Sequence, residues 1–361
     1  MEEDGIIFST SKDVFYNPAM RLCRSMSSLA VGAIGEKLEV VDAFCASGIR
    51  GIRYAKENKN VKKLTSIDID KRAIALAKKN AKANKLKASA VISNISRAAF
   101  EYDADFLEID PFGTPSPYLV DAFRFFNTKK TAYLSVTATD VAVLCGGKTA
   151  ACMKNYHSKP MNNEFTHETG LRIMLKKIAE TAAEFNMGIT PLISFSDKHY
   201  LKSVLMARRS ADLAYDSLKQ LGHVSFCDKC GFRSSGRFPD ARCGNCSSAM
   251  DFAGPLWLGE LHDAKFLKKM SALNTARKYA DRDEIADMLV DMQGEAGMPA
   301  YFYNVHALCK LQQLKSVPKM DDILARLRKA GHKAVRTHFS PIGIKTDAPY
   351  SAVMEAIEWK S

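Results

Sequence analysis

The first two hundred residues alternate between short apolar runs and longer segments with helical spacing. The apolar runs that predict strands occupy residues 38–44, 64–69, 104–109, 131–137, 188–195 and 200–207. Segments with helical character lie between them, at 49–58, 71–85, 116–126 and 166–185. Strands that alternate with helices of this length predict right-handed crossovers and a largely parallel, doubly wound α/β sheet. The last two runs are closely spaced, so we expect them to form an antiparallel pair.

The composition and the apolar periodicity of the chain change after about residue 222. Residues 227–248 are rich in Gly, Ser and Cys and have little apolar periodicity. Helical patterns follow at 262–271, 282–291 and 320–330, and a basic tail with Pro341 and Pro349 comes last. We therefore expect two domains, one covering residues 1–222 and a smaller α+β domain covering residues 223–361.

Composition narrows the class of protein. The chain has 361 residues, of which 47% are hydrophobic and 25% are charged, and these ordinary globular values exclude disorder and collagen-like repeats. No apolar run reaches 18 residues, and Glu2, Glu3 and Asp4 stand at the start. These features predict neither a spanning helix nor a signal peptide, and hence a soluble protein of the cytoplasm. Five scattered cysteines suit a reducing compartment.

Positive charge is unevenly distributed. Lys and Arg number 52 against 40 Asp and Glu, which leaves a formal charge of +12. Between Lys310 and Lys345 there are nine Lys or Arg and only two acids, Asp321 and Asp322. A basic surplus favours a polyanionic partner, and its position predicts that the second domain carries the contact.

The segment from Asp42 to Gly51 has the pattern of a nucleotide cradle. An acid ends the strand, small residues form the turn, and a helix follows whose first N–H groups are free to bind a ligand. The segment lacks the dinucleotide G-x-G-x-x-G fingerprint, so a ligand with a carboxylate and a ribose fits better than NAD. An ordinary strand-turn-helix corner is the alternative interpretation.

Asp68 ends the next strand, about 20 residues after that turn, where an acid can accept hydrogen bonds from both ribose hydroxyls. Asp70 competes for the same assignment, because either acid can cap the helix that begins near Lys71. We prefer Asp68 as the ribose ligand, since it lies nearer the strand end.

Asp110-Pro111-Phe112-Gly113 follows the third strand, where parallel sheets place their ligand crevice. A carboxylate at this point can accept hydrogens from an exocyclic amine of a nucleobase, and Phe112 can stack on the base. A capped turn beside a core phenylalanine is the alternative, since Asp-Pro is common in loops.

Cysteine spacing predicts a zinc site. Cys227, Cys230, Cys243 and Cys246 form two Cys-x2-Cys pairs separated by a short polar loop. Four thiolates close a tetrahedral site and leave no open position, so the zinc would be structural. The eight histidines have no spacing that predicts a catalytic metal.

Taken in order, these pieces resemble the tRNA guanine-N2 dimethyltransferase family, which modifies the guanine at tRNA position 26, in its archaeal type. The resemblance covers nearly the whole chain. The segments that carry it are Val14–Pro18 with Arg24, Asp42–Arg53, Asp110–Pro115, Thr137–Gly146, Glu168–Arg172, Gly254–Gly259 with His262-Asp263, Thr337–Phe339 and Thr346–Pro349.

The resemblance implies a Rossmann-like class I methyltransferase domain that uses S-adenosylmethionine, and a C-terminal domain with a zinc site and a winged-helix-like portion. It implies two methyl transfers to one exocyclic amine of a tRNA substrate, with no membrane partner, and we expect a monomer. By position, the S-adenosylmethionine contacts are Arg24, Arg50, Asp68, Asn94 and Ile95, to which the strand-end acid Asp42 is added. Asp110 matches the catalytic carboxylate, and Phe15 and Phe112 match aromatics that sandwich the guanine. Where the family usually has Asp-Ala, this chain has Asn94-Ile95.

Other functions remain as alternatives at this stage. The Asp-Pro-aromatic run is shared in outline by amine methyltransferases that act on DNA adenine, DNA cytosine or other RNA. A non-enzymatic, zinc-dependent RNA-binding protein is a second alternative, and a dinucleotide oxidoreductase is a weaker one.

Overall fold

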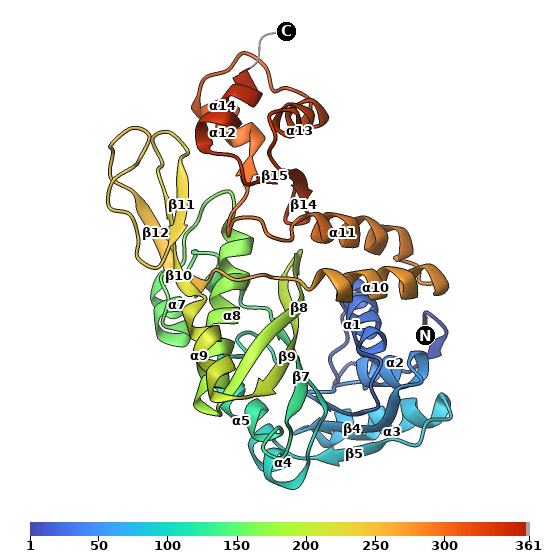
Figure 1. The fold of residues 1–361 in the computed structure, drawn as a ribbon. Helices are drawn as coiled ribbons and strands as arrows, with labels where there is room; N and C mark the ends of the chain where they lie inside the picture. The colour runs from blue at the N-terminus through green and yellow to red at the C-terminus, as the bar shows by residue number, and fades with distance from the viewer. Residues whose placement is uncertain (359–361) are drawn as a thin grey trace.

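A seven-stranded mixed sheet forms the centre of the larger unit in the computed structural model, which describes residues 1–358 (Figure 1). Its strand order is β5-β4-β3-β6-β7-β9-β8. Strands β3 to β7 pair in parallel, whereas β9 is antiparallel to both β7 and β8. The strands are β3 (Leu38–Ala43), β4 (Val61–Asp68), β5 (Ser89–Ile92), β6 (Phe106–Ile109), β7 (Thr131–Ala138), β8 (Met187–Asp197) and β9 (Tyr200–Arg209). The predicted α/β sheet and its antiparallel last pair are confirmed.

Helices cover both faces of this sheet (Figure 1). Neighbouring strand residues point to opposite faces, so Val40 packs in the core that contains α1, whereas Val41 packs in the core that contains α5 and α8. Side-chain N-caps begin several helices, including Asp70 at α3 and Asn94 at α4. The helices are α1 (Arg21–Ile34), α2 (Ile49–Glu57), α3 (Lys71–Ala83), α4 (Ile95–Glu101), α5 (Leu119–Arg124), α6 (Val141–Leu144), α7 (Thr149–Tyr156), α8 (Thr166–Glu184) and α9 (Ala211–Lys219), with 3-10 turns η1 (Pro18–Met20) and η2 (Ser116–Tyr118). Helix α1 was not predicted, because its serines weaken the helical pattern.

The chain after the central sheet first forms a small antiparallel sheet with the order β11-β10-β12. These strands are β10 (Leu221–Phe226), β11 (Arg233–Gly236) and β12 (Asp251–Trp257). Helices α10 (Ala264–Ala276) and α11 (Arg282–Gly294) follow, and α10 packs on α1. The hydrophobic core is continuous across residue 222, because Val224 and Leu256 belong to the same buried cluster as Leu134. The division at 222 falls inside β10 and stays a prediction.

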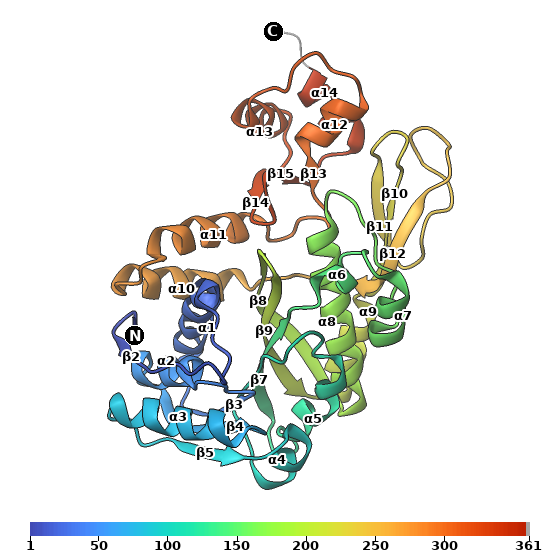
Figure 2. The same cartoon turned by 180° about the vertical axis from the view of Figure 1, so that it is seen from behind.

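A third unit ends the described chain and lies at the top of Figure 1. It comprises β13 (Tyr303–Asn304), α12 (Val305–Leu311), α13 (Met320–Lys329), β14 (Ala334–Thr337), β15 (Ser340–Thr346) and α14 (Tyr350–Glu358). Its strands pair in the order β13-β15-β14 (Figure 2). It has its own buried cluster around Ile323 and Val353. At the other end of the chain, β1 (Glu2–Glu3) and β2 (Ile6–Ile7) form a small hairpin. Within residues 1–358, no helix has the length and apolar character needed to span a membrane.

A buried ion pair connects this third unit to α8, one of the helices that cover the central sheet. Lys345 on β15 is 1% exposed and donates to Glu168 Oε1 at 2.5 Å, and Arg172 donates to the same oxygen at 2.9 Å. Lys345 belongs to the basic tract noted in the sequence. Its burial means that it takes no part in a surface that contacts another molecule.

Candidate functional site

A cavity of about 500 Å³ opens at the carboxyl ends of β3, β4 and β6. Parallel α/β sheets place ligands at this edge. Seven of the side chains singled out in the sequence line it together: Phe15, Arg24, Asp42, Arg50, Asp68, Asp110 and Phe112. The parallel strands therefore bring the strand-end acids to one place.

The turn between β3 and α2 has an unusual backbone. Phe44 and Ala46 both adopt positive φ angles, 76° and 46°, which side chains beyond glycine rarely do. Gly48 follows with φ 76°, and a Cβ there would lie 2.9 Å from the Cβ of Ala77. The turn therefore holds its backbone close to the cavity in a conformation that the neighbouring strand and helix impose.

Asp68 and Asp70 have different positions. Asp68 lines the cavity, where its Oδ2 accepts from the backbone N–H of Ala46 at 2.9 Å. Asp70 caps α3 through the N–H of Arg72 at 2.8 Å and pairs with the same arginine's side chain. Since Asp70 already serves as the helix cap, Asp68 is the acid available to a ligand in the cavity.

Arg50 and Asp110 form an ion pair in the cavity wall. Behind them, Glu108 is fully buried on β6 and accepts from Lys202 at 2.5 Å and from the hydroxyl of Tyr54 at 2.7 Å. Burial by itself raises the pKa of Glu108, but Lys202 and Arg50 outweigh it and keep the carboxyl below its ordinary value. Sequence reasoning missed this buried pair, although a charge inside each of two apolar strands was a signal for it.

Asp42 lies at the base of the cavity and is 2% exposed. Its Oδ2 accepts from the N–H of Gly51 in the first turn of α2 at 3.1 Å. Burial, and after it the negative charge of Glu108, raises the pKa of Asp42 to about 7. This carboxyl is therefore partly protonated near neutral pH, unlike an exposed aspartate.

The N-terminal hairpin supplies a further buried acid. Glu3 on β1 accepts from Nε and Nη2 of Arg24 and from Nη1 of Arg53 at 2.9 Å. Burial alone would raise the pKa of Glu3, but Arg24 and Arg53 lower it. Tyr16 donates to Glu3 at 3.1 Å and lies under the Arg24 guanidinium. Nothing in the local sequence around Glu3 indicated this role.

Phe15 and Phe112 meet at the mouth of the cavity. Their ring centroids lie 4.8 Å apart with the planes at 82°, an edge-to-face contact, and the side chains remain 54% and 77% exposed. The rings close on each other and leave no room for a base between them. A hydrogen bond holds the loop that carries Phe112 to the residue after β7: the backbone N–H of Gly113 donates to the hydroxyl of Thr139 at 2.8 Å.

Asn94 and Ile95 do not line the cavity. Asn94 caps α4 by accepting from the N–H of Arg97 at 2.8 Å, and Ile95 is 6% exposed within the core. Their backbone follows β5, next to the strand that carries Asp68. Their predicted contact with the cofactor stays a prediction.

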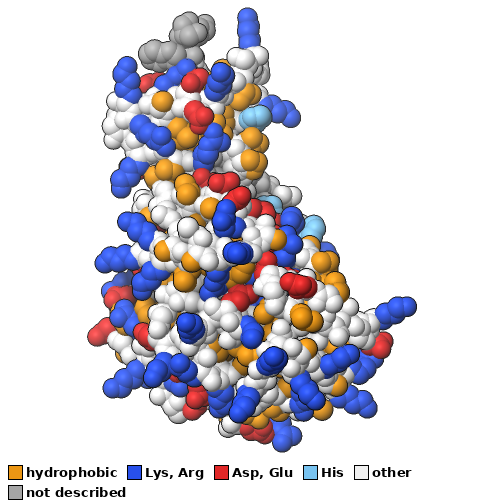
Figure 3. Space-filling view, turned by 90° about the vertical axis from the view of Figure 1, so that its right-hand side faces the viewer, with side chains coloured by type: hydrophobic (Ala, Val, Ile, Leu, Met, Phe, Trp, Pro, Cys, Tyr) orange, Lys and Arg blue, Asp and Glu red, His pale blue; other side chains and the backbone are white. Residues whose placement is uncertain are grey.

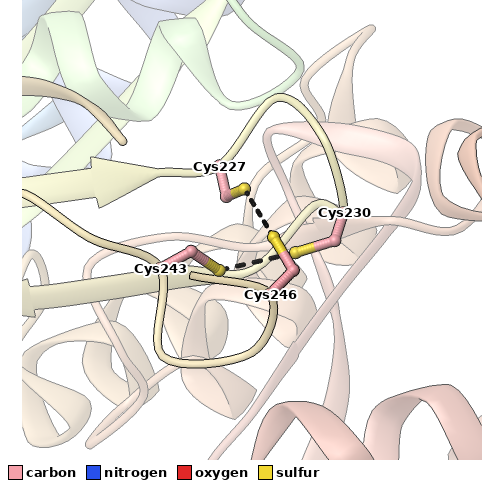
Figure 4. A group of neighbouring side chains, drawn as sticks. All are labelled: Cys227, Cys230, Cys243 and Cys246. Atoms are coloured by element: carbon pink, nitrogen blue, oxygen red, sulfur yellow. Dashed lines mark hydrogen bonds between the residues drawn. The ribbon is translucent and has the colours of Figure 1, made fainter. Parts of the chain in front are cut away.

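The four cysteines of the second half converge as their spacing predicted (Figure 4). The sulfur of Cys227 lies 3.6 Å from that of Cys246, and the sulfurs of Cys230 and Cys243 are 3.5 Å apart. A zinc ion with Zn–S bonds of about 2.3 Å needs sulfurs about 3.8 Å apart in a tetrahedron. The donor set is four thiols without a carboxylate, and it fits a closed zinc site.

A second group, formed by His262, Glu295 and His338, was not predicted. Their potential ligand atoms lie within 4.8 Å of one another. The backbone N–H of Ser194 donates to Nδ1 of His262 at 3.3 Å, so the neutral ring carries its proton on Nε2 and offers no lone pair there to a metal. Glu295 Oε1 accepts from the hydroxyl of Thr337 at 2.9 Å and from Nδ1 of His338 at 2.7 Å. His262 Nε2 lies 3.8 Å from Glu295 Oε2, beyond hydrogen-bond distance. We interpret this group as a buried polar joint where β8, the end of α11 and the β14–β15 turn meet.

Comparisons with known proteins cover the chain from end to end. The family model described as "TRM: N2,N2-dimethylguanosine tRNA methyltransferase" matches residues 1–358. A curated protein of Methanobrevibacter smithii, named tRNA (guanine(26)-N(2))-dimethyltransferase, is 34% identical over 97% of this chain and 92% of its own length. A protein of the same name from Thermococcus kodakarensis is 37% identical over 96% of this chain and 93% of its own length. The solved structure of Trm1 from Pyrococcus horikoshii with S-adenosyl-L-methionine has a TM-score of 0.88 and 31% identity, and it covers 98% of this chain and 97% of its own.

Proposed function

The chain belongs to the N2,N2-dimethylguanosine tRNA methyltransferase family, and on that premise we propose that it transfers two methyl groups to the exocyclic N2 amine of guanine 26 in tRNA. The product is N2,N2-dimethylguanine. The observation that carries the proposal is the match along the whole chain, at more than 30% identity, to relatives named for this activity. The acid-lined cavity at the sheet edge supports it independently.

The cavity fits S-adenosylmethionine, which supplies a methyl group on a sulfonium that is already a good electrophile. Asp68 would hold the ribose hydroxyls, and the guanidinium groups of Arg24 and Arg50 would face the carboxylate end. Asp42 would add a carboxyl at the base of the cavity. Since the methyl donor is reactive by itself, the main task of the protein is to align the accepting nitrogen with it.

Asp110 would act on the accepting amine. The amine of guanine is a poor nucleophile because its lone pair is delocalised into the ring. A carboxylate oxygen that accepts one amine hydrogen lets the nitrogen become pyramidal as its new bond forms. Such assistance is typically worth about 10²–10⁴-fold in rate.

Phe15 and Phe112 would enclose the guanine. Their present edge-to-face contact leaves no gap for a base, so entry of the guanine must separate the two rings. Because both rings are already largely exposed, their separation uncovers little buried surface. The base itself must leave the tRNA fold, at a cost of a few kcal/mol, and stacking between aromatic rings offsets part of that cost.

The unit formed by residues 303–358 would contact the tRNA backbone. The helices α12 and α13 followed by the β14–β15 hairpin have the order of a winged helix, which supports the expected winged-helix-like portion. Lys and Arg side chains stand out on this unit in Figure 3, where few acidic side chains are visible. Exposed cations include Arg328, Lys329 and Lys333. Contacts of this kind make binding depend strongly on salt.

Charge reversal at the end of α13 tests this assignment. The double change Lys329→Glu and Lys333→Glu is expected to weaken tRNA binding about tenfold and to lower the slope of log affinity against log salt by about 2. Affinity for S-adenosylhomocysteine should be unchanged, because the cavity lies in the other half of the molecule. Fluorescence anisotropy with labelled tRNA at several salt concentrations measures the first effect, and calorimetry measures the second.

The matched control is Lys78→Glu with Lys82→Glu, which makes the same charge change on the exposed face of α3. This control should leave tRNA binding close to that of the unmodified protein. Equal losses in both double variants would mean that tRNA responds to net charge and does not dock on residues 303–358.

We propose that Cys227, Cys230, Cys243 and Cys246 hold one structural zinc ion. The support is the all-thiol donor set, the sulfur spacing, and the backbone N–H of Asn245, which donates to the sulfur of Cys243 at 3.4 Å. With four thiolates the ion has no free position for substrate. Its role would be to fold a polar segment that has little core of its own.

The proposed activity is tested by nucleoside mass spectrometry. Unmodified tRNA is treated with the protein and S-adenosylmethionine, digested and analysed. We expect N2,N2-dimethylguanosine, and loss of the signal when guanine 26 is replaced by adenine. Methylation of a DNA duplex in place of tRNA, or absence of any methylated guanosine, would contradict the proposal.

A further inference from the structure

The ion pair between Arg50 and Asp110 joins two groups to which the proposed function gives separate partners. Arg50 is the second residue of α2, and Asp110 follows β6 directly, so both side chains enter the cavity from its wall. The guanidinium Nη2 donates to Oδ2 of Asp110. One carboxylate oxygen that should accept the guanine amine is therefore already occupied by Arg50.

The donors of Arg50 are not saturated. Among residues 1–358, its Nη1 has only the sulfur of Cys23 as a partner, at 3.5 Å, and sulfur is a weak acceptor. Its Nε lies 3.9 Å from Glu108 Oε1, beyond hydrogen-bond distance. A ligand carboxylate that pairs with the Nη1–Nη2 edge of Arg50 would gain a weakly partnered donor in Nη1 and would compete with Asp110 for Nη2.

Arg24, the other arginine expected to face the cofactor, is in a different situation. Its Nε and Nη2 both donate to the carboxylate of Glu3, and its Nη1 donates to the carbonyl of Asn17 at 3.1 Å. Every side-chain nitrogen of Arg24 has an oxygen partner. Arg50 is therefore the arginine that can exchange its partner at the lower cost in free energy.

The surroundings allow Arg50 to leave Asp110. Glu108 remains behind the guanidinium as a second negative charge, and Lys202 and Tyr54 hold it in place. An arginine with this neighbour does not become an uncompensated buried charge when its bond to Asp110 breaks. The side chain of Asp110 is 20% exposed, so it can turn toward the cavity without becoming an unpaired buried charge.

We propose that Asp110 pairs with Arg50 as long as no cofactor carboxylate is bound there. Binding of the cofactor's carboxylate then moves Arg50 away from Asp110, and Asp110 becomes free to accept the guanine amine. This exchange rests on the proposed function, which supplies both ligands. It makes the binding order matter, because the ion pair holds the Asp110 carboxylate against the cavity wall until the cofactor has bound. No covalent bond is formed or broken in the exchange.

The exchange predicts that a change at Asp110 affects only one of two ligands that differ at one end. S-Adenosylhomocysteine carries the carboxylate, whereas 5′-methylthioadenosine has the same adenosine and sulfur but no carboxylate. In the Asp110→Asn variant, Arg50 loses its competing anion. Calorimetry should then show S-adenosylhomocysteine binding about fivefold more tightly than to the unmodified protein, with the affinity for 5′-methylthioadenosine unchanged.

Two controls interpret the result. Asp68→Asn should weaken both ligands by the same factor, because both contain the ribose. In the unmodified protein, S-adenosylhomocysteine should increase the affinity for tRNA, whereas 5′-methylthioadenosine should leave it unchanged.

Weaker or unchanged binding of S-adenosylhomocysteine by Asp110→Asn would overturn the exchange, since Asp110 would then orient Arg50 and not compete for it. Equal tightening of both ligands would also overturn it, because the effect would not depend on the carboxylate. If the unmodified protein binds neither ligand, the proposed function itself fails, and this outcome is distinct from the other two.

Discussion

Replacing Asp110 with alanine is expected to lower the rate of methyl transfer by about 10²–10⁴-fold while tRNA binding is retained. The carboxylate lies at the carboxyl end of β6, on the wall of the cavity that also contains Asp42 and Asp68. The other carboxylates that line the cavity are Asp42, which is 2% exposed, and Asp68, which accepts from the N–H of Ala46. Single-turnover methylation of tRNA measures the rate, and anisotropy measures tRNA binding.

The structure offers a matched control in Asp103. This aspartate is exposed in the loop before β6, at the opposite end of the strand from Asp110. Asp103→Ala should turn over at close to the normal rate. S-Adenosylhomocysteine binding by Asp110→Ala shows that the cavity is intact. A rate within a few-fold of normal in Asp110→Ala would remove the carboxylate from the mechanism.

Loss of the proposed zinc ligands is expected to have the second large effect, on stability and on tRNA binding together. The backbone carbonyl of Cys230 accepts from Tyr350 at the start of α14 and from Gln312 after α12 at 3.1 Å. The four-cysteine cluster is therefore hydrogen-bonded to the unit that carries the basic surface. Binding of zinc by such a site contributes about 10–16 kcal/mol in isolated peptides. Cys230→Ala should unfold the segment from Cys227 to Cys246 and weaken tRNA binding.

Native mass spectrometry should find one zinc per unmodified chain and none in Cys230→Ala. Thermal unfolding followed by circular dichroism should show a lower midpoint for the variant. Cys309→Ala is the control, since Cys309 is also buried in the second half but lies in the hydrophobic core of the C-terminal unit. An unmodified chain without metal, or a Cys230→Ala variant that keeps its zinc, would contradict the four-cysteine site.

The convergence of the strand-end acids and of the four cysteines was largely predictable, because the signals for both are local in the sequence. The acids Asp42, Asp68 and Asp110 each end an apolar run, and parallel strands place their carboxyl ends at one edge. Cysteine spacing likewise predicts a convergent site without any knowledge of the fold. The confirmed antiparallel pair of β8 and β9 followed from their short connection.

Contacts between distant residues were not predictable in this way. Lys202 reaches Glu108 from 94 positions away, and Lys345 reaches Glu168 from 177 positions away. A lysine inside an apolar run, such as Lys202, indicates a buried charge, but the sequence does not name its partner. Periodicity shows that a residue is buried or exposed, but it carries no information about which buried charge will be its partner.

By itself, the sequence determined the α/β class, the strand-end acids and the four-cysteine site, because hydrophobic period and residue spacing act over short lengths of chain. Only the tertiary structure decided that Arg50 lies against Asp110, that Phe15 closes on Phe112, and that His262, Glu295 and His338 meet at a joint. Those contacts depend on how whole elements pack and on which charges can be buried only as pairs. The chemistry of the cavity is set by that packing.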